Sequence, residues 1–261
     1  MQPVSNAAVL ESLLPLEQVA TRTWLEAQGF RRHSLDNLVK SRRLVLLTKG
    51  VYARPQLPVS WQGVVASLPR LMAPPVVVGG LTSLELQGFS HYVQMGQNQD
   101  VNLWAPTACP RWLERVFESL PQRLRWHTGK WLWKNQWPSK PELRDFPWQD
   151  RMTLQLSAPE QAWLELLSTV PEDVSLEHAD QILQGLTALS PRKLTQLLGD
   201  CRSVKVKRLF FWLADRQQHA WRKSLDPRAF AMGNGKRVLV PGGKLDPTYL
   251  ITVPAELLHE H

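Results

Sequence analysis

The sequence predicts an α+β protein whose N-terminal part is a winged helix–turn–helix. Apolar residues recur at helical spacing through the first forty residues, and two β-prone runs follow around a Thr-Lys-Gly tip. Mixed α/β and then mainly helical patterns fill the remaining chain. At 261 residues and 43% hydrophobic composition, the chain is long enough for two domains. We expect residues 1–56 to form the first domain and residues 57–261 the second.

Two helices are expected before a glycine turn. Residues 5–14 and 16–28 each carry apolar side chains at helical spacing, and Pro15 separates them. Gly29 then supplies the turn, because the end of a helix favours a residue that tolerates a positive φ.

A basic helix and a wing follow that turn. Residues 31–43 are expected to be helical, and residues 44–47 and 51–53 to pair as a hairpin. From Arg31 to Arg54 there are seven Lys or Arg residues and one acid. Such an arrangement presents a cationic helix to the major groove of DNA, where Arg and Asn read base edges and Lys and Arg hold phosphates. The residues expected to bind DNA are Arg31, Arg32, His33, Asn37, Lys40, Arg42, Arg43 and Lys49. The alternative is a solvated basic face on an ordinary three-helix domain.

Beyond Pro55 and Pro58 the pattern changes. Residues 57–156 are expected to be α/β, with helices at 61–72 and 83–88 and strands at 76–78, 100–104, 123–127 and 151–156. Residues 157–261 are expected to be mainly helical, with helices at 159–169, 176–187, 191–200 and 203–217 and a terminal hairpin between 238–240 and 249–253.

The net charge of +8 favours a polyanionic partner, and it is distributed unevenly. Residues 157–200 hold seven acids and two bases, whereas residues 201–244 hold eleven bases and two acids. The basic stretch is the candidate surface for a second partner: Arg202, Lys205, Lys207, Arg208, Lys236 and Arg237. It fits a nucleic acid or an acidic protein, and pairing with the acidic helices inside the fold is an equally good interpretation.

Signatures of catalysis and of metal or cofactor binding are missing from the sequence. There is no Glu-x-Lys, Gly-Ser, Asp-x-Asp or Asp-x-Glu, no phosphate-binding loop and no nucleophile elbow. We therefore expect no catalytic residue, no metal and no cofactor. Trp131, Trp133 and Trp137 alternate and are a candidate stacking surface, although core packing is the better interpretation.

Two widely spaced cysteines, Cys109 and Cys201, indicate a reducing compartment. The first residues lack a basic leader, and no apolar run is long enough to span a membrane. We expect a cytoplasmic protein without a membrane partner.

Three stretches of the sequence share a pattern with a known family. They are WLEAQGF…NLVKSRRL…KGVYARP at 24–55, VVGGLTSLELQGFSHYV at 77–93 with SAPEQAWLELL at 157–167, and CRSVKVKRLFFWLADRQQHAW at 201–221 followed by GKRVLVPGGKLDPTYLITVP at 235–254. Through these stretches the chain resembles the AbiEi-type antitoxins, the transcriptional-regulator half of abortive-infection (type IV) toxin–antitoxin systems. It implies an autorepressor that binds promoter DNA through its N-terminal domain. It also implies neutralisation of a nucleotidyltransferase-like toxin through the C-terminal part.

Two positions depart from the family pattern. Arg31 stands where the family usually has a small hydroxyl residue that opens the recognition helix, and Arg42 stands where it usually has glycine before the wing. Both departures add positive charge.

The rival functions are a nucleic-acid-processing enzyme with an accessory winged helix, and an RNA-binding protein that shields the substrate of the toxin.

Overall fold

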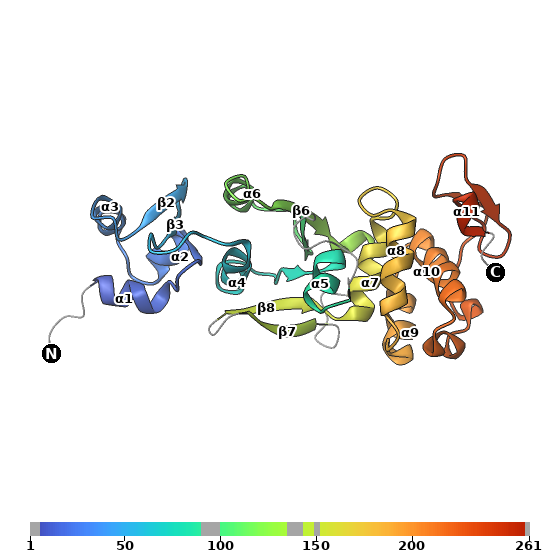
Figure 1. Ribbon diagram of the computed structural model, residues 1–261. Helices are drawn as coiled ribbons and strands as arrows, with labels where there is room; N and C mark the ends of the chain where they lie inside the picture. Colours follow the sequence, from blue (N-terminus) through green and yellow to red (C-terminus); the bar gives the residue numbers. More distant parts are fainter. Residues whose placement is uncertain (1–5, 90–99, 135–142, 149–151, 259–261) are drawn as a thin grey trace. The chain divides into compact units, whose positions relative to one another are not determined.

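Figure 1 shows the computed structural model, which describes residues 6–89, 100–134, 143–148 and 152–258. The fold class is α+β, as predicted. The chain folds into two compact units. The first comprises Met1–Val77, Gln99–Trp126 and Asp145–Gln155, and the second comprises Val78–Asn98, His127–Arg144 and Leu156–His261. The predicted boundary after residue 56 therefore falls inside the first unit.

The first unit begins with the elements expected of a helix–turn–helix with a wing. In order they are α1 (Asn6–Leu13), β1 (Val19–Thr21), α2 (Arg22–Ala27), α3 (Arg32–Lys40), β2 (Val45–Thr48) and β3 (Val51–Ala53). The strands form an antiparallel sheet in the order β1-β3-β2. The helices and sheet enclose one apolar core: Leu10, Leu14, Ala20, Leu25, Phe30, Leu35, Leu38, Leu44 and Tyr52.

One predicted helix is partly a strand. Residues 16–28 were expected to be helical throughout, but Val19–Thr21 form β1, which pairs with β3 in the register Val19 opposite Ala53. The helix starts only at Arg22, where the Thr21 hydroxyl accepts a hydrogen bond from the Trp24 backbone N–H. Pairing with a distant strand has overridden a local helical pattern. The predicted turn at Gly29 is confirmed by a φ of +94°.

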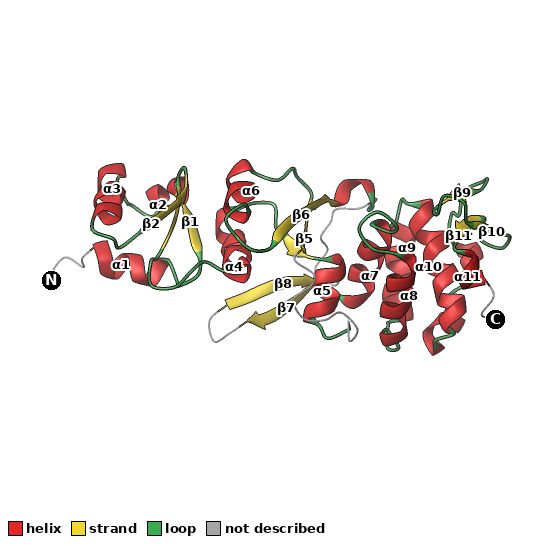
Figure 2. Ribbon diagram, turned by 45° about the horizontal axis from the view of Figure 1, so that its top comes forward, coloured by secondary structure: helices red, strands yellow, loops and turns green. Residues whose placement is uncertain are grey.

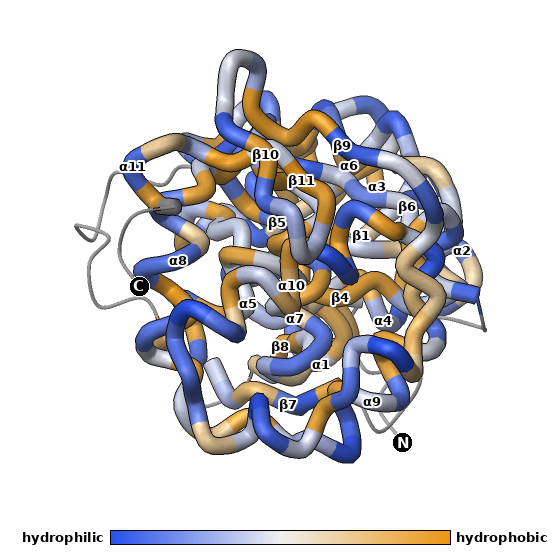
Figure 3. Tube along the Cα trace, turned by 90° about the vertical axis from the view of Figure 1, so that its right-hand side faces the viewer, coloured by the Kyte–Doolittle hydropathy of each residue, from blue (hydrophilic) through white to orange (hydrophobic). Residues whose placement is uncertain are grey.

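A five-stranded sheet follows, in the order β6-β5-β4-β8-β7. Its strands are β4 (Val77–Val78), β5 (Asp100–Ala105), β6 (Arg123–Thr128), β7 (Leu143–Trp148) and β8 (Met152–Ser157). The valines of β4 are fully buried, and β4 has the colour of hydrophobic residues in Figure 3. β4 runs parallel to β8. The sequence predicted four of these strands. It did not predict β7 or the short helix α6 (Arg111–Phe117).

Helices dominate the remainder of the chain. The elements are α4 (Trp61–Leu71) in the first unit, and α5 (Gly80–Leu86), α7 (Pro159–Ser168), α8 (Leu176–Gly185), α9 (Pro191–Asp200) and α10 (Val204–Gln217) in the second. Within the second unit, α10 packs against α7 and α8, and α9 packs against α7 (Figure 2). The predicted helices 159–169, 176–187, 191–200 and 203–217 are confirmed to within two residues at each end. The predicted helix 83–88 begins earlier, because the buried Glu165 carboxylate accepts the Gly80 backbone N–H at 2.9 Å.

The terminal hairpin is built differently from the prediction. The sheet order is β10-β11-β9, with β9 (Arg237–Val238), β10 (Lys244–Asp246) and β11 (Ile251–Val253). β9 runs parallel to β11, so the two predicted strands are not the arms of a hairpin, and β10 supplies the antiparallel partner. The physical reason is a tight turn between β10 and β11, in which the Leu250 N–H donates to the Asp246 carbonyl.

Candidate nucleic-acid interface

Helix α3 turns a polar, cationic face away from the core. Leu35 and Leu38 are buried and fix the orientation of the helix about its axis. Arg32, Asn37 and Lys40 are exposed on the remaining surface. Because the buried leucines are three residues apart, side chains on the opposite side of the helix point to solvent.

Arginines occupy both ends of α3. Arg31 is the N-cap residue, and its side chain makes no capping hydrogen bond. After Lys40, the Arg42 N–H donates to the Val39 carbonyl at 3.0 Å and the Arg43 N–H donates to the Leu38 carbonyl at 2.9 Å. This pattern is a Schellman motif with Arg42 at the position that usually holds glycine. Accordingly, Arg42 has a left-handed φ of +55°, which is strained for a residue with a side chain.

The wing places a lysine at its tip. β2 and β3 are joined at Lys49 and Gly50, and the Lys49 side chain is exposed. The turn is anchored to α2, because the Arg22 N–H donates to the Gly50 carbonyl at 2.7 Å. A register shift between Leu46 and Thr48 bends the strand that leads to the tip.

The structure leaves all the residues predicted to bind DNA exposed to solvent: Arg31, Arg32, His33, Asn37, Lys40, Arg42, Arg43 and Lys49. They lie on α3, at its two ends and at the tip of the wing, which all belong to one compact unit. The arrangement can present cations to a polyanion without moving any element of the core.

Helix α4 clamps the strand β1 that supports this surface. The Ser67 hydroxyl accepts the Val19 N–H at 3.0 Å, and the Arg70 guanidinium donates to the Val19 carbonyl at 2.8 Å. Burial lowers the pKa of Arg70 to about 10, still well above neutrality, so the side chain remains charged at pH 7. A Cβ at Gly63 would lie 2.1 Å from the Glu17 carbonyl oxygen, so only glycine allows this close approach. A fragment that ends at residue 56 would lose these contacts.

The basic stretch after α9 is only partly at the surface. Arg202, Lys236 and Arg237 are exposed, whereas Lys207 and Arg208 retain 3% and 2% of their accessible surface. The prediction that these basic residues share one accessible surface is therefore wrong for Lys207 and Arg208. Nothing in the local sequence distinguishes them from their exposed neighbours, because the groups that cover them come from other parts of the chain.

Arg208 holds the C-terminal segment in place. Its guanidinium donates to the carbonyl oxygens of Met232 at 2.8 Å, Gly233 at 2.9 Å and Gly235 at 2.6 Å, and to that of Leu250 at 3.3 Å. This set of acceptors explains how a charged side chain is tolerated at 2% exposure. The contribution of Arg208 is structural.

Some of the basic residues pair with acids of the stretch 157–200, as one interpretation of the sequence proposed. The Lys205 ammonium lies 3.3 Å from the Glu172 carboxylate, and the Arg216 guanidinium lies 3.6 Å from that of Asp180. Arg222 instead pairs with Asp215 on α10 at 2.7 Å. Internal pairing thus accounts for part of the basic stretch, and Arg202, Lys236 and Arg237 remain exposed.

The tryptophan group divides between core and surface. Trp133 is buried at 4% exposure, whereas Trp131 is 47% exposed. Trp137 lies outside the described residues. The alternating pattern therefore does not form a flat aromatic surface within the described part.

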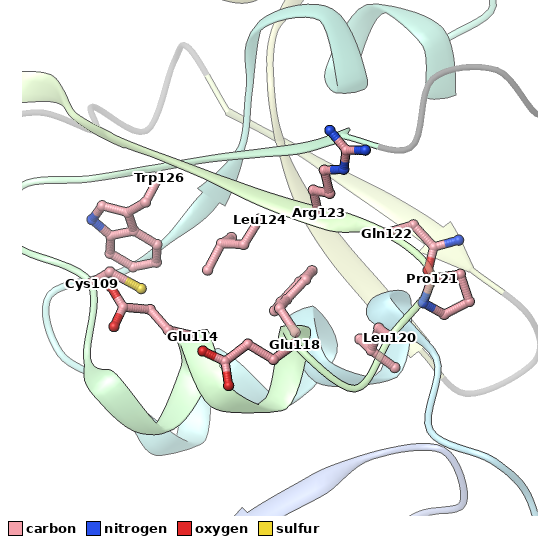
Figure 4. A pocket seen from close by; sticks show the side chains of 10 residues that line it. Cys109, Glu114, Glu118, Leu120, Pro121, Gln122, Arg123, Leu124 and Trp126 are labelled. Carbon is pink, nitrogen blue, oxygen red and sulfur yellow. The ribbon is translucent and has the colours of Figure 1, made fainter.

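A groove of about 470 Å³ lies between α6 and β6, in the first unit. Figure 4 shows Leu124 and Trp126 from the strand on one side and Glu114 and Glu118 from the helix on the other. Burial raises the pKa of the Cys109 thiol to about 12, so this lining residue is protonated at pH 7 and is a poor nucleophile. The residues predicted to bind DNA or a partner do not line this groove.

Within the described ranges, no group of three or more His, Cys, Asp or Glu side chains is arranged to hold a metal ion. In the same described residues, no helix combines the length and the apolar character needed to cross a membrane.

Comparisons with known proteins cover nearly the whole chain. The crystal structure of the RV2827C protein from Mycobacterium tuberculosis is similar in fold, with a TM-score of 0.58 and 15% sequence identity over 94% of this chain and 88% of that chain. A comparison with curated proteins gave no match. Residues 6–95 match the family model of the AbiEi antitoxin N-terminal domain, which is described as a transcriptional regulator. Residues 98–254 match the model of the AbiEi antitoxin, a transcriptional regulator of a type IV toxin–antitoxin system. The chain therefore belongs to the AbiEi antitoxin family of transcriptional regulators.

Proposed function

We propose that this protein represses its own operon by binding promoter DNA through α3 and the wing. The observation that carries the proposal is the joint exposure of the predicted cations on α3, at both of its ends and at Lys49. In this arrangement α3 enters the major groove, Arg32 and Asn37 contact base edges, and the terminal arginines and Lys49 contact phosphates.

The rigid support of α3 favours this function. Its orientation is set by Leu35 and Leu38, and the sheet behind it is held by α4 through Ser67 and Arg70. A rigidly supported helix binds DNA without the cost of ordering its backbone, so only the exposed side chains lose freedom on association.

The test is fluorescence anisotropy of the full-length chain with labelled duplex DNA from upstream of its own gene, and with a scrambled duplex as control. We expect tighter binding to the native duplex, with a log–log salt slope of about −0.9 for each phosphate contact. Equal affinity for both duplexes, or binding that does not respond to salt, would refute the assignment.

We further propose that the second unit counteracts a nucleotidyltransferase-like toxin in the cytoplasm. The family supports an antitoxin role, and the exposed Arg202, Lys236 and Arg237 offer basic side chains for it. Lys205, three residues after Arg202, is partly exposed. Replacing the three exposed residues with Glu in the full-length chain should abolish rescue of cells that express the toxin. Operator binding should remain. If rescue persists in the folded variant, the antitoxin surface lies elsewhere.

A further inference from the structure

Helix α6 belongs to the same compact unit as α3 and the wing, although it comes much later in the sequence. It packs against β2, which is the outer strand of the wing in the sheet order β1-β3-β2. Figure 1 shows α6 beside this strand. The fold of the first unit therefore places a further helix next to the proposed DNA-binding surface.

Both ends of β2 carry cations that the proposed function assigns to DNA phosphates. Arg42 and Arg43 lie before the strand, and Lys49 follows it. The strand has four residues and spans about 13 Å, so a helix that contacts β2 lies close to at least one of its ends. Phosphates recur about every 3.4 Å of axis on each strand of a duplex. A duplex that contacts both ends of β2 thus has further phosphates within range of α6.

The packing of α6 turns two arginines to solvent. Leu113, Val116 and Phe117 are buried and fix the orientation of the helix about its axis. Arg111 and Arg115 are exposed on the remaining surface. Because they are four residues apart, their side chains leave the same face of the helix one turn from each other.

The fold itself does not use these two arginines. In the described part of the chain, no hydrogen bond or ion pair involves the guanidinium of Arg111 or of Arg115. Glu114 and Glu118 line the groove between α6 and β6, whereas neither arginine lines it (Figure 4). Exposed side chains without partners contribute little to the stability of a fold. Both cations are therefore available to an external anion.

We propose that Arg111 and Arg115 bind operator phosphates next to those bound by the wing, so that α6 extends the DNA interface beyond the winged helix. The proposal rests on the proposed repressor function and adds phosphate contacts to it. A guanidinium group holds a phosphate through charge-assisted hydrogen bonds, which can be bidentate. Such contacts fix the position of the protein on the duplex and carry no sequence information.

The first experiment measures how operator binding by the full-length Arg111→Gln/Arg115→Gln variant depends on salt, using fluorescence anisotropy. Each lost phosphate contact lowers the log–log slope by about 0.9, so we expect a decrease of about 1.8. Affinity for the native and the scrambled duplex should fall by the same factor, because phosphate contacts do not distinguish sequences. Arg111→Lys/Arg115→Lys keeps both charges and should keep most of the slope.

Lys223→Gln/Arg228→Gln is the matched control. Both residues are exposed in the second unit, and the variant loses the same two positive charges as the α6 variant. An effect of net charge alone would lower the slope in both variants, whereas a direct contact lowers it only in the α6 variant. Both should unfold at the wild-type temperature, because the replaced side chains are exposed. The proposal is overturned if the α6 variant keeps the wild-type slope, or if the control loses as much.

A series of operator duplexes shortened from either end tests the position of the contact. For the wild-type chain, removal of the phosphates nearest α6 should lower the slope by about 1.8 while the preference for the native sequence persists. For the α6 variant the same shortening should change the slope little, because these contacts are already missing. If shortening lowers the slope equally for both proteins, Arg111 and Arg115 do not touch those phosphates and the proposal is overturned.

The two proposals fail in different ways. If the wild-type chain binds the native and the scrambled duplex equally, the repressor function is refuted, and the comparison of slopes still decides the role of α6. If the wild type prefers the native duplex and the α6 variant keeps the full slope, operator binding by α3 and the wing stands and only the α6 contact is refuted. Absence of any DNA binding refutes both.

Discussion

Arg42 offers the sharpest test of the relation between stability and DNA binding in this chain. It has a φ of +55° at the C-terminal end of α3, in a Schellman motif closed by the Arg42 and Arg43 N–H groups. A left-handed conformation costs a residue with a side chain about 1–2 kcal/mol. Glycine avoids this cost but raises the entropy of the unfolded chain, which offsets about 0.4–1 kcal/mol. Arg42→Gly should therefore stabilise the chain by about 0.5–1 kcal/mol.

The same change removes an exposed cation beside the proposed recognition helix. If Arg42 contacts a phosphate, Arg42→Gly should reduce the log–log salt slope of operator binding by about 0.9. Arg42→Ala is the matched control, because it removes the same charge but keeps a side chain at a left-handed position. We expect the two variants to bind the operator equally weakly, while only Arg42→Gly gains stability.

The assays are thermal or denaturant unfolding followed by circular dichroism, and anisotropy titration across a range of salt concentrations. A stabilisation of this size raises the melting temperature by about 1–4 °C. The backbone argument fails if Arg42→Gly is no more stable than Arg42→Ala. The phosphate argument fails if both variants keep the wild-type salt slope.

Three other predictions concern single side chains. Arg31→Ser should supply the missing capping hydrogen bond of α3 and raise the free energy of unfolding by about 1 kcal/mol, while anisotropy shows weaker operator binding. A variant less stable than the wild type would contradict the capping argument. Asn37→Ala should reduce the difference in affinity between the native and the scrambled duplex, whereas Lys49→Ala should lower the affinity for both duplexes equally. If the two variants change these affinities in the same way, α3 does not read bases. Arg208→Met should lower the free energy of unfolding by about 3 kcal/mol or more, because four carbonyl oxygens lose a charged donor; a change below about 1 kcal/mol would mean that those bonds are not stabilising.

The elements that could be predicted are those specified by neighbouring residues. Helices α8, α9 and α10 each begin after a serine whose hydroxyl caps the first turn: Ser175, Ser190 and Ser203. Apolar residues at helical spacing then continue to the end of each helix. Cap and periodicity are both local, so the observed bounds agree closely with the expected ones.

The elements that could not be predicted depend on distant partners. β1 has only three residues, and it pairs with residues of β3 that lie 30 or more positions later in the sequence. The early start of α5 depends on Glu165, which lies 85 residues away from Gly80. The direction of β9 could not be predicted either, because it depends on parallel pairing with β11, whose antiparallel partner is β10.

The same distinction applies to the candidate sites. The exposure of the α3 cations follows from Leu35 and Leu38, two buried residues within the same helix. The burial of Lys207 and Arg208 could not be inferred in this way. The carbonyl acceptors of Arg208 come from residues 232–250, and the neighbours of Lys207 come from before α10.

The two basic regions should therefore respond to salt in different ways. The α3 cations are exposed, so dissolved ions screen them and any DNA contact made by Arg32 or Lys40 weakens steeply as salt increases. Arg208 is almost completely buried and donates to four carbonyl oxygens, and a charge in such a position is screened much less. The loss of stability caused by Arg208→Met should hence be nearly the same at low salt and at salt concentrations that release the operator. If that loss shrinks with salt as steeply as operator binding does, the Arg208 guanidinium is screened by solvent and does not hold the C-terminal segment as a buried charge.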